Sequence, residues 1–238
     1  MKSSILIVFL LCSLAVCHPS MAVEKTGSSL QCNFPVKDVD SLIVAGKSDA
    51  AVESILKPAL KQLEVIRKSD PRKLYCARTG AETMLYLLGA GGSAVVIDSN
   101  FALAYYYLAY VDIDRGDFKS AEANLREALV LSPSNPAFLS ELGHLYQLKK
   151  DWPKSIELFD SAIFATDSCS PDKLKNVEKS RALRGKAYSL VEMNQLKEAK
   201  KIYLECLEID PNDRKAKAEI RYIDDGLEQM QKNKKNGD

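Results

Sequence analysis

The chain has 238 residues, 46% of them hydrophobic, and a formal net charge of +1. That apolar content is enough for a sizeable core, and the balanced charge excludes a surface that is basic overall and attracts nucleic-acid phosphates. The sequence contains two histidines, too few for the triads and zinc sites on which much hydrolytic chemistry depends.

The first 22 residues are typical of a secretory signal. Lys2 precedes an apolar run, Ile5–Val16, and the small-x-small segment Ser20–Ala22 follows it. The run has about a dozen residues, whereas a membrane-spanning helix needs about 20. We therefore expect cleavage near Ala22, residues 1–22 as the signal peptide, and an exported protein in the periplasm.

A second interpretation of the N-terminus is lipidation. Leu14-Ala15-Val16-Cys17 is similar to a lipobox, although valine stands where that motif has Gly, Ala or Ser. In that case the chain is an outer-membrane lipoprotein, acylated at Cys17, that assists assembly of an envelope secretion or pilus complex. Membrane attachment is expected only in this case.

The N-terminal region, residues 23–100, is predicted to be helical after a loose polar lead-in that ends near Lys37. Apolar residues recur at three- and four-residue spacings between Asp49 and Arg67, which indicates an amphipathic helix that Pro58 bends or splits. A second helix is predicted from Ala81 to Ile97, as the second helix of a degenerate repeat. The glycines of Gly89–Ser93 lack the Gly-Lys-Ser/Thr ending of a phosphate loop and are assigned to close helix packing.

Four cysteines follow the signal, namely Cys32, Cys76, Cys169 and Cys206. An even number in an exported chain permits two disulfides, and the sequence leaves all three pairings open. Cys32 and Cys76 flank the N-terminal helical segment and make the more plausible bridge, worth about 3 to 4 kcal/mol. Two alternatives remain, a buried structural thiol at Cys206 and a thiol-based redox protein that uses Cys76 or Cys169.

Residues 101–211 contain an internal repeat. The pattern of Phe101–Pro133 recurs 34 positions later: Leu108-Ala109 corresponds to Leu142-Gly143, Phe118 to Trp152 and Ala128 to Ala162. In the third repeat the residue that corresponds to Ala128 and Ala162 is Cys206, which lies 44 positions after Ala162. Ten residues are therefore inserted where two helices join, and we expect them to lengthen the connection or the next helix. A capping helix is predicted at 212–232, with Ile220, Ile223, Leu227 and Met230 on one face, and a disordered tail at 233–238.

This helix-turn-helix pattern with its 34-residue period resembles the tetratricopeptide repeat (TPR) family. Tyr75–Arg78 and Leu139–Tyr146 are also similar to segments of bacterial TPR proteins without an assigned function. The resemblance implies an all-α helical-hairpin solenoid with about three repeats, a degenerate N-terminal repeat and a C-terminal capping helix. It also implies that the first helix of each pair lines a concave groove. The residues so placed are Leu103, Tyr106, Tyr110, Ile113, Ala137, Ser140, His144, Gln147, Arg181, Arg184, Tyr188 and Val191.

Tyrosines at one end of this stripe, polar groups in the middle and arginines at the other suit a peptide with an apolar part and an acidic part. The alternative is that the chain's own N-terminal or capping helix covers the tyrosines and makes them core. The dicarboxylate clamp of chaperone-binding TPR domains is not matched, because Tyr106 and Tyr110 stand where that clamp has Lys and Asn.

Catalysis is not expected, because only His144 follows the signal. Asp112–Asp117 lacks the glycine and late glutamate of a calcium loop and is assigned to the turn inside a helix pair. No metal, cofactor or nucleic-acid partner is predicted. The sequence therefore predicts a non-enzymatic adaptor or assembly scaffold that binds a protein or peptide in its groove.

Overall fold

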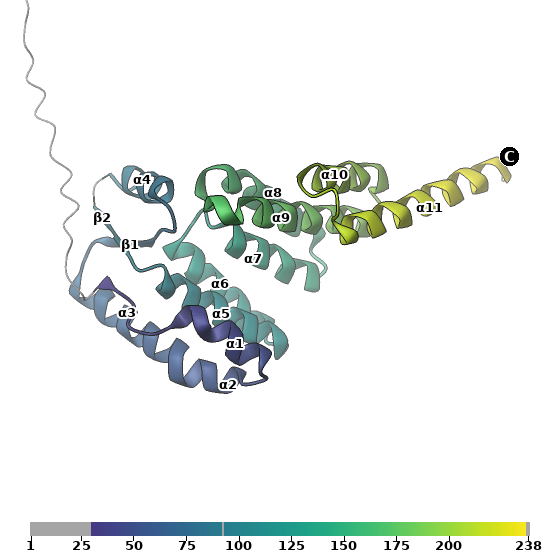
Figure 1. The fold of residues 1–238 in the computed structure, drawn as a ribbon. Helices are drawn as coiled ribbons and strands as arrows, with labels where there is room; N and C mark the ends of the chain where they lie inside the picture. The colour runs from purple at the N-terminus through teal and green to yellow at the C-terminus, as the bar shows by residue number, and fades with distance from the viewer. Residues whose placement is uncertain (1–29, 92, 237–238) are drawn as a thin grey trace, which may run out of the picture.

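The computed structural model describes residues 30–91 and 93–236. The predicted signal, Cys17 and most of the lead-in lie outside these residues, as does Gly92. Figure 1 shows helices side by side from α5 to α11, with smaller elements gathered at the N-terminal end. Within the described ranges, no helix combines the length and apolar character needed to cross a bilayer.

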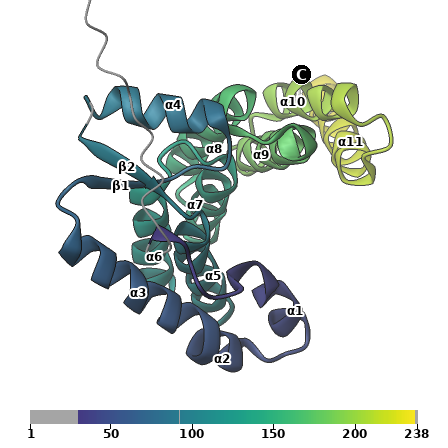
Figure 2. The same ribbon diagram turned by 60° about the vertical axis from the view of Figure 1, so that its left-hand side comes forward.

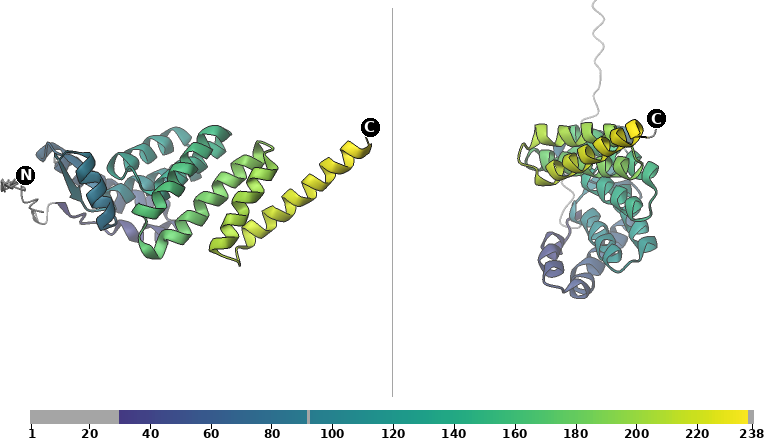
Figure 3. Two further views of the ribbon diagram at one scale, coloured as in Figure 1. Left: turned by 90° about the horizontal axis from the view of Figure 1, so that it is seen from above. Right: turned by 90° about the vertical axis from the view of Figure 1, so that its right-hand side faces the viewer.

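The array consists of three helical hairpins and a final helix, as the repeat predicts (Figure 3). The hairpins pair α5 (Asn100–Asp114) with α6 (Phe118–Leu131), α7 (Pro136–Leu148) with α8 (Trp152–Cys169), and α9 (Asp172–Glu192) with α10 (Leu196–Ile209). Gly116, Lys150 and Asn194 occupy the same place in the three hairpin turns, and each has a positive φ, between 57° and 76°. Asp117 and Asp151, the residues after the first two, then cap the following helices with their side chains.

The last helix, α11 (Arg214–Asn236), is longer than the predicted capping helix and includes part of the expected disordered tail. It packs on the third hairpin through Ala216 and Ile223, with Ile220 and Leu227 partly buried beside them. Met230, predicted on the same face, is exposed. The helix therefore covers the end of the array along its first half, as expected of a cap.

The N-terminal region begins with η2 (Val36–Asp38) and α1 (Val39–Val44), followed by one long helical stretch. That stretch comprises α2 (Ser48–Ala51), the π-helical segment η3 (Val52–Leu56) and α3 (Lys57–Ser69). Pro58 has no backbone N–H, and the wider π turn directly before it accommodates the proline without breaking the helix. Val52, Leu56 and Ala59 form a core with Ala104 and Val111 of α5.

The helix predicted from Ala81 to Ile97 is wrong beyond Gly89. The structure has β1 (Lys73–Cys76), α4 (Gly80–Gly89) and β2 (Ala94–Ile97), with the strands parallel and Lys73 opposite Ala94. Gly91 has φ +61° and ends the helical path, after which the β-branched run pairs with β1. This region is a β-α-β unit, not a helical pair (Figure 2). The close helix packing predicted for these glycines is wrong for Gly89 and Gly91, because nothing lies within 4 Å of a Cβ built on either residue.

The ten inserted residues lengthen two helices. α8 has 18 residues, against 14 in the other second helices α6 and α10, and α9 has 21, against 15 and 13 in the first helices α5 and α7. The added turns bind the β-α-β unit through Arg78. Its guanidinium contacts Glu178 of α9 at 2.6 Å and donates to the Cys169 carbonyl at 3.2 Å. Ser170 also donates to Glu178, while the buried Glu82 of α4 accepts from the Arg78 backbone. The insertion thus adds polar contacts to the apolar ones through which the N-terminal region packs on the repeats.

Two glycines allow the middle of the array to pack closely. A Cβ on Gly185 of α9 would lie 2.2 Å from Cζ of Phe159, and one on Gly143 of α7 would lie 3.1 Å from the same atom. Phe159 belongs to α8 and is 2% exposed, so its ring has little room to move. The ring therefore fills the space that the two first helices leave where they carry no side chain.

Gly185→Ala should lower the free energy of unfolding by about 1 to 3 kcal/mol, because the added methyl overpacks the ring of Phe159. Gly226→Ala is the matched control. It introduces the same methyl within α11, where the nearest contact is an ordinary 3.5 Å from Leu196, and it should stabilise by up to about 1 kcal/mol. Chemical denaturation measures both. Adding Phe159→Leu should recover part of the loss, and equal stability of the two alanine variants would contradict the packing argument.

Candidate functional site

The N-terminal end of the predicted stripe is largely core. The ring of Tyr106 stacks on Phe138 of α7 at 5.2 Å, and its hydroxyl donates to Glu141. Leu103 and Tyr106 also pack against the N-terminal helices. The alternative in which the chain's own helices cover the tyrosines therefore holds for Tyr106, and Leu103 is covered in the same way. Tyr110, one turn further along α5, is 46% exposed.

The centre of the stripe contains a buried glutamate that sequence reasoning did not place in the site. Glu141 is 3% exposed and forms an ion pair with Arg181 of α9. Its other carboxylate oxygen lies 3.4 Å from Nδ1 of His144. Burial alone would raise the pKa of Glu141, but the contacts with His144 and Arg181 hold it below its ordinary value. Ser140 is buried, with its hydroxyl unpaired.

The other predicted polar residues also bind within the chain. Gln147 donates to the carbonyl of Gly185 at 2.8 Å and to the Ser189 hydroxyl at 2.9 Å. Arg184 pairs with Asp213, which also accepts from backbone amides at the start of α11. Both arginines expected to bind a partner's carboxylate thus already have carboxylates of this chain. The expectation of free arginines for an acidic partner is wrong.

The exposed part of the stripe is aromatic. Tyr110, His144 and Tyr188 occupy equivalent positions on α5, α7 and α9, separated by 34 and then, with the ten inserted residues, 44 positions. Tyr222 lies 34 positions after Tyr188, on α11. We call these four residues the aromatic column. Their repeat positions predict that they follow one another along the first-helix face.

The chain has ten tyrosines, and the three that are exposed all belong to the aromatic column. Tyr110, Tyr188 and Tyr222 are 46%, 42% and 64% exposed, and the other seven are buried or half-buried. Burial, together with the charges of Glu192 and Glu219, raises the pKa of Tyr188. Glu219 lies one helical turn before Tyr222, which places that face of α11 beside Tyr188. Sequence reasoning missed Tyr222, although the 34-residue period points to it.

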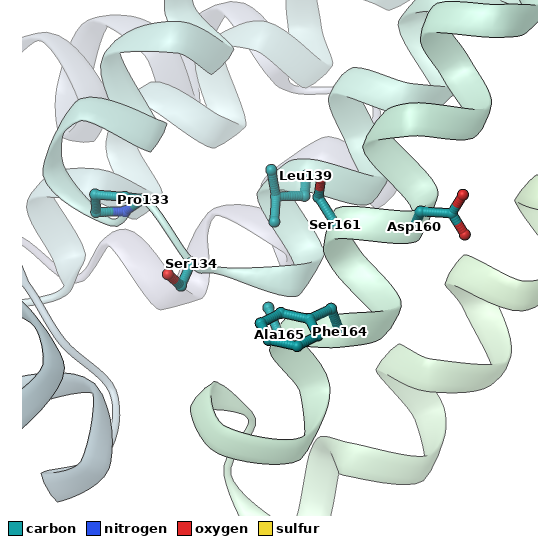
Figure 4. Close-up of a pocket in the computed structure, with 7 residues that line it drawn as sticks. All are labelled: Pro133, Ser134, Leu139, Asp160, Ser161, Phe164 and Ala165. Atoms are coloured by element: carbon teal, nitrogen blue, oxygen red, sulfur yellow. The ribbon is translucent and has the colours of Figure 1, made fainter.

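A separate open hollow of about 470 Å³ lies beside the α7–α8 hairpin (Figure 4). None of its lining residues belongs to the predicted stripe. Phe164, 85% exposed, stands at its edge, and its single titratable residue, Asp160, pairs with Lys186 at 2.7 Å. The hollow therefore presents one carboxylate, already neutralised, and no arrangement of groups suited to catalysis.

The four described cysteines are all thiols. Cys32 and Cys76 lie in one apolar cluster and each donates to a nearby backbone carbonyl, so the predicted bridge is not formed here and remains a prediction. Burial raises the pKa of Cys76 and of Cys206 to about 12, and burial also raises that of Cys169. Because the thiolate is the reactive form, these thiols are poorly suited to redox chemistry.

The stacked hairpins and terminal helix define the chain as an α-solenoid, a class of repeat protein in which each unit packs on its neighbours. A family model described as a tetratricopeptide repeat matches residues 179–213, which include most of the third hairpin. Residues 179–213 are thus a tetratricopeptide repeat, and the same hairpin repeated from residue 100 onward gives the chain the tetratricopeptide-repeat fold. No curated protein matches the sequence.

Several solved structures are similar to parts of this chain at low sequence identity. PilF of Pseudomonas aeruginosa is 18% identical, with a TM-score of 0.57 over 82% of this chain and 68% of that one. The Sgt2 TPR domain of Aspergillus fumigatus is 19% identical, with a TM-score of 0.48 over 55% and 82%. The second TPR domain of human RPAP3, solved with the HSP70 peptide SGPTIEEVD, is 15% identical, with a TM-score of 0.44 over 52% and 94%.

Glu141→Gln should lower the free energy of unfolding by about 2 kcal/mol near pH 7, because it leaves Arg181 without its charged partner. The pKa of Glu141 in the folded protein lies below its ordinary value of 4.5. The stabilisation is therefore complete above that value and is lost as pH falls through the lower, folded pKa. Denaturation curves across this range should show the wild type and the variant converging in acid.

The control for this substitution is Glu157→Gln, which removes an exposed glutamate paired with Lys154. It should change stability by less than about 0.5 kcal/mol at any pH. A pH-independent difference between wild type and Glu141→Gln would show that the charge of Glu141 does not carry the effect.

Proposed function

We propose that the chain is a non-enzymatic interaction module that binds a protein or peptide segment along the aromatic column. The observation that carries this proposal is the separation of roles on the first-helix face. Tyr106, Glu141, Arg181 and Arg184 bind one another or neighbouring helices, whereas the column residues present exposed rings. Exposed tyrosines in line supply contact area at little cost in conformational entropy, as expected of a binding surface.

The partner would be an extended or helical segment that lies across several repeats. A TPR array is rigid along its length because each hairpin packs on the next, so its exposed rings are held in place before a partner arrives. An adaptor or assembly scaffold needs this property, since preorganisation reduces the entropy lost on binding. The buried thiols and the paired carboxylates support this function better than redox or acid-base catalysis.

Export to the periplasm is part of the same proposal. It rests on the basic start, the apolar run Ile5–Val16 and the small residues before Val23. In an oxidising compartment Cys32 and Cys76 could form the predicted bridge, since both belong to one cluster.

Tyr110→Ala together with Tyr188→Ala should reduce binding of the partner at least tenfold while the fold is kept, because both rings lie at the surface, 46% and 42% exposed. Photo-crosslinking from a reactive amino acid at position 144, between the two, should capture the partner in wild-type cells and lose it in the double variant. Circular dichroism checks the fold.

Phe164→Ala is the matched control, since it removes an aromatic ring that is 85% exposed on α8, outside the column. It should leave partner capture unchanged. Equal capture by the double variant and the wild type would remove the proposal that the column is the binding surface.

Mass spectrometry of the mature N-terminus tests export. A chain that begins at Val23 with a free amine is expected after signal cleavage. A diacylglyceryl-modified Cys17 would establish the lipoprotein alternative instead, and a chain that retains Met1 would contradict both.

A further inference from the structure

The open hollow beside the α7–α8 hairpin has a counterpart one repeat earlier. Three of the α8 residues that line it correspond, 34 positions before, to three residues of α6. Those α6 residues line a hollow of about 340 Å³ at the first hairpin. The equivalent pairs are Glu127 and Ser161, Val130 and Phe164, and Leu131 and Ala165. The two hollows therefore occupy the same place in successive repeats.

At the first hairpin this place is covered by a segment of the chain itself, residues 67–74, which we call the covering segment. Arg67, near the end of α3, pairs with Glu127 of α6 at 3.0 Å. At the other end of the segment, Leu74 of β1 packs in one apolar cluster with Leu131 of α6. A guanidinium and a leucine thus hold the covering segment across α6.

At the second hairpin the same place is open. Its lining residues all come from α7, α8 and the turn before α7, whereas α3 and β1 also contribute to the first hollow. Figure 4 shows Leu139 and the Phe164 ring among these lining residues. Phe164 is 85% exposed, against 52% for Val130. The second hairpin therefore exposes a surface that in the first hairpin contacts the covering segment.

The residues that differ between the two places indicate which side chain fits at the Arg67 end of the open one. Ser161 stands where Glu127 pairs with the guanidinium. Leu139 stands where Tyr105 presents its ring to Arg67, 5.9 Å from the guanidinium carbon. Both groups that hold Arg67 are thus replaced by groups that do not attract a cation. An apolar side chain fits there instead, against Leu139.

The rest of the open hollow also favours an apolar occupant. Ala165 is smaller than Leu131, its equivalent, so it leaves room for a large apolar side chain. Asp160, the single carboxylate among the lining residues, pairs with Lys186 at 2.7 Å. A cation on a partner would have to displace that lysine.

We propose that the hollow binds a short segment of a partner protein that crosses α8 as the covering segment crosses α6, with large apolar side chains in the places of Arg67 and Leu74. One apolar side chain packs on Leu139 and Phe164, and the other fills the space beside Ala165. Burial of these two side chains supplies most of the affinity. This surface is separate from the aromatic column, and the inference does not rest on the proposed function.

The test uses the full mature chain and two synthetic peptides that differ at one position. One has the sequence of residues 67–74, and the other has leucine in place of Arg67. In a titration followed by NMR chemical shifts, the leucine peptide should bind the wild-type chain at least tenfold more tightly than the arginine peptide, because its leucine is buried in the hollow. Phe164→Ala should weaken the leucine peptide about tenfold. Val130→Ala, the equivalent change in the first hairpin, should leave its binding unchanged.

Ser161→Glu supplies the converse test. It places on an exposed residue of α8 the carboxylate that Glu127 presents on α6. The arginine peptide should then gain about threefold in affinity, the effect of one surface ion pair, while the leucine peptide gains nothing.

Equal binding of the two peptides to the wild-type chain, or binding of neither, would overturn the inference. Self-association of the chain that Phe164→Ala abolishes, measured by sedimentation velocity, would also overturn it, because the occupant would then be a second copy. The proposed function is tested separately by capture from position 144, which Phe164→Ala should leave unchanged whichever result the peptides give.

Discussion

The close packing of the first helices around Phe159 is the constraint on which the array depends. Gly185 leaves no room for a Cβ beside that ring and Gly143 leaves only a tight space, so the α7–α8 hairpin and α9 pack at a close separation. This separation sets the spacing of the side chains that α7 and α9 carry, including those of the aromatic column. A change in this buried packing would therefore shift the exposed side chains that α7 and α9 carry.

The ten-residue insertion connects the repeats to a region that is not a repeat. It lengthens α8 and α9 and supplies Glu178 and the Cys169 carbonyl to Arg78, which is distant in the sequence. Because Arg78 and Glu178 are both largely buried, the loss of one partner would leave the other charge unpaired, a state more costly than the pair itself. The unit formed by β1, α4 and β2 is thus held to the array by these specific charges as well as by the apolar cluster in which Leu74, Cys76 and Ile97 pack against α5 and α6.

The sequence predicts the fold where the signal is local and periodic. The 34-residue period, the turns and the length of the insertion follow from the positions of small and apolar residues between Phe101 and Pro211. The strands were missed because Ala94–Ile97 is a short apolar run, and its partner, Lys73–Cys76, lies outside any local pattern. The burial of α4 also differs from what an amphipathic pattern predicts, because Glu82 and Tyr86 are buried while Met84, Leu85 and Leu88 are exposed.

The candidate site shows the same division between what periodicity can and cannot specify. Repeat positions identify the residues of the first-helix face, and they lead to Tyr222 once α11 is treated as a further first helix. They do not reveal that Glu141 and Asp213 neutralise Arg181 and Arg184, because each pair joins side chains from different helices. Those pairs fix the helices relative to one another, which leaves the exposed rings as the groups available to a partner. α11 therefore has two roles, since Ile223 closes the core on one face while Tyr222 extends the aromatic column beyond the last hairpin.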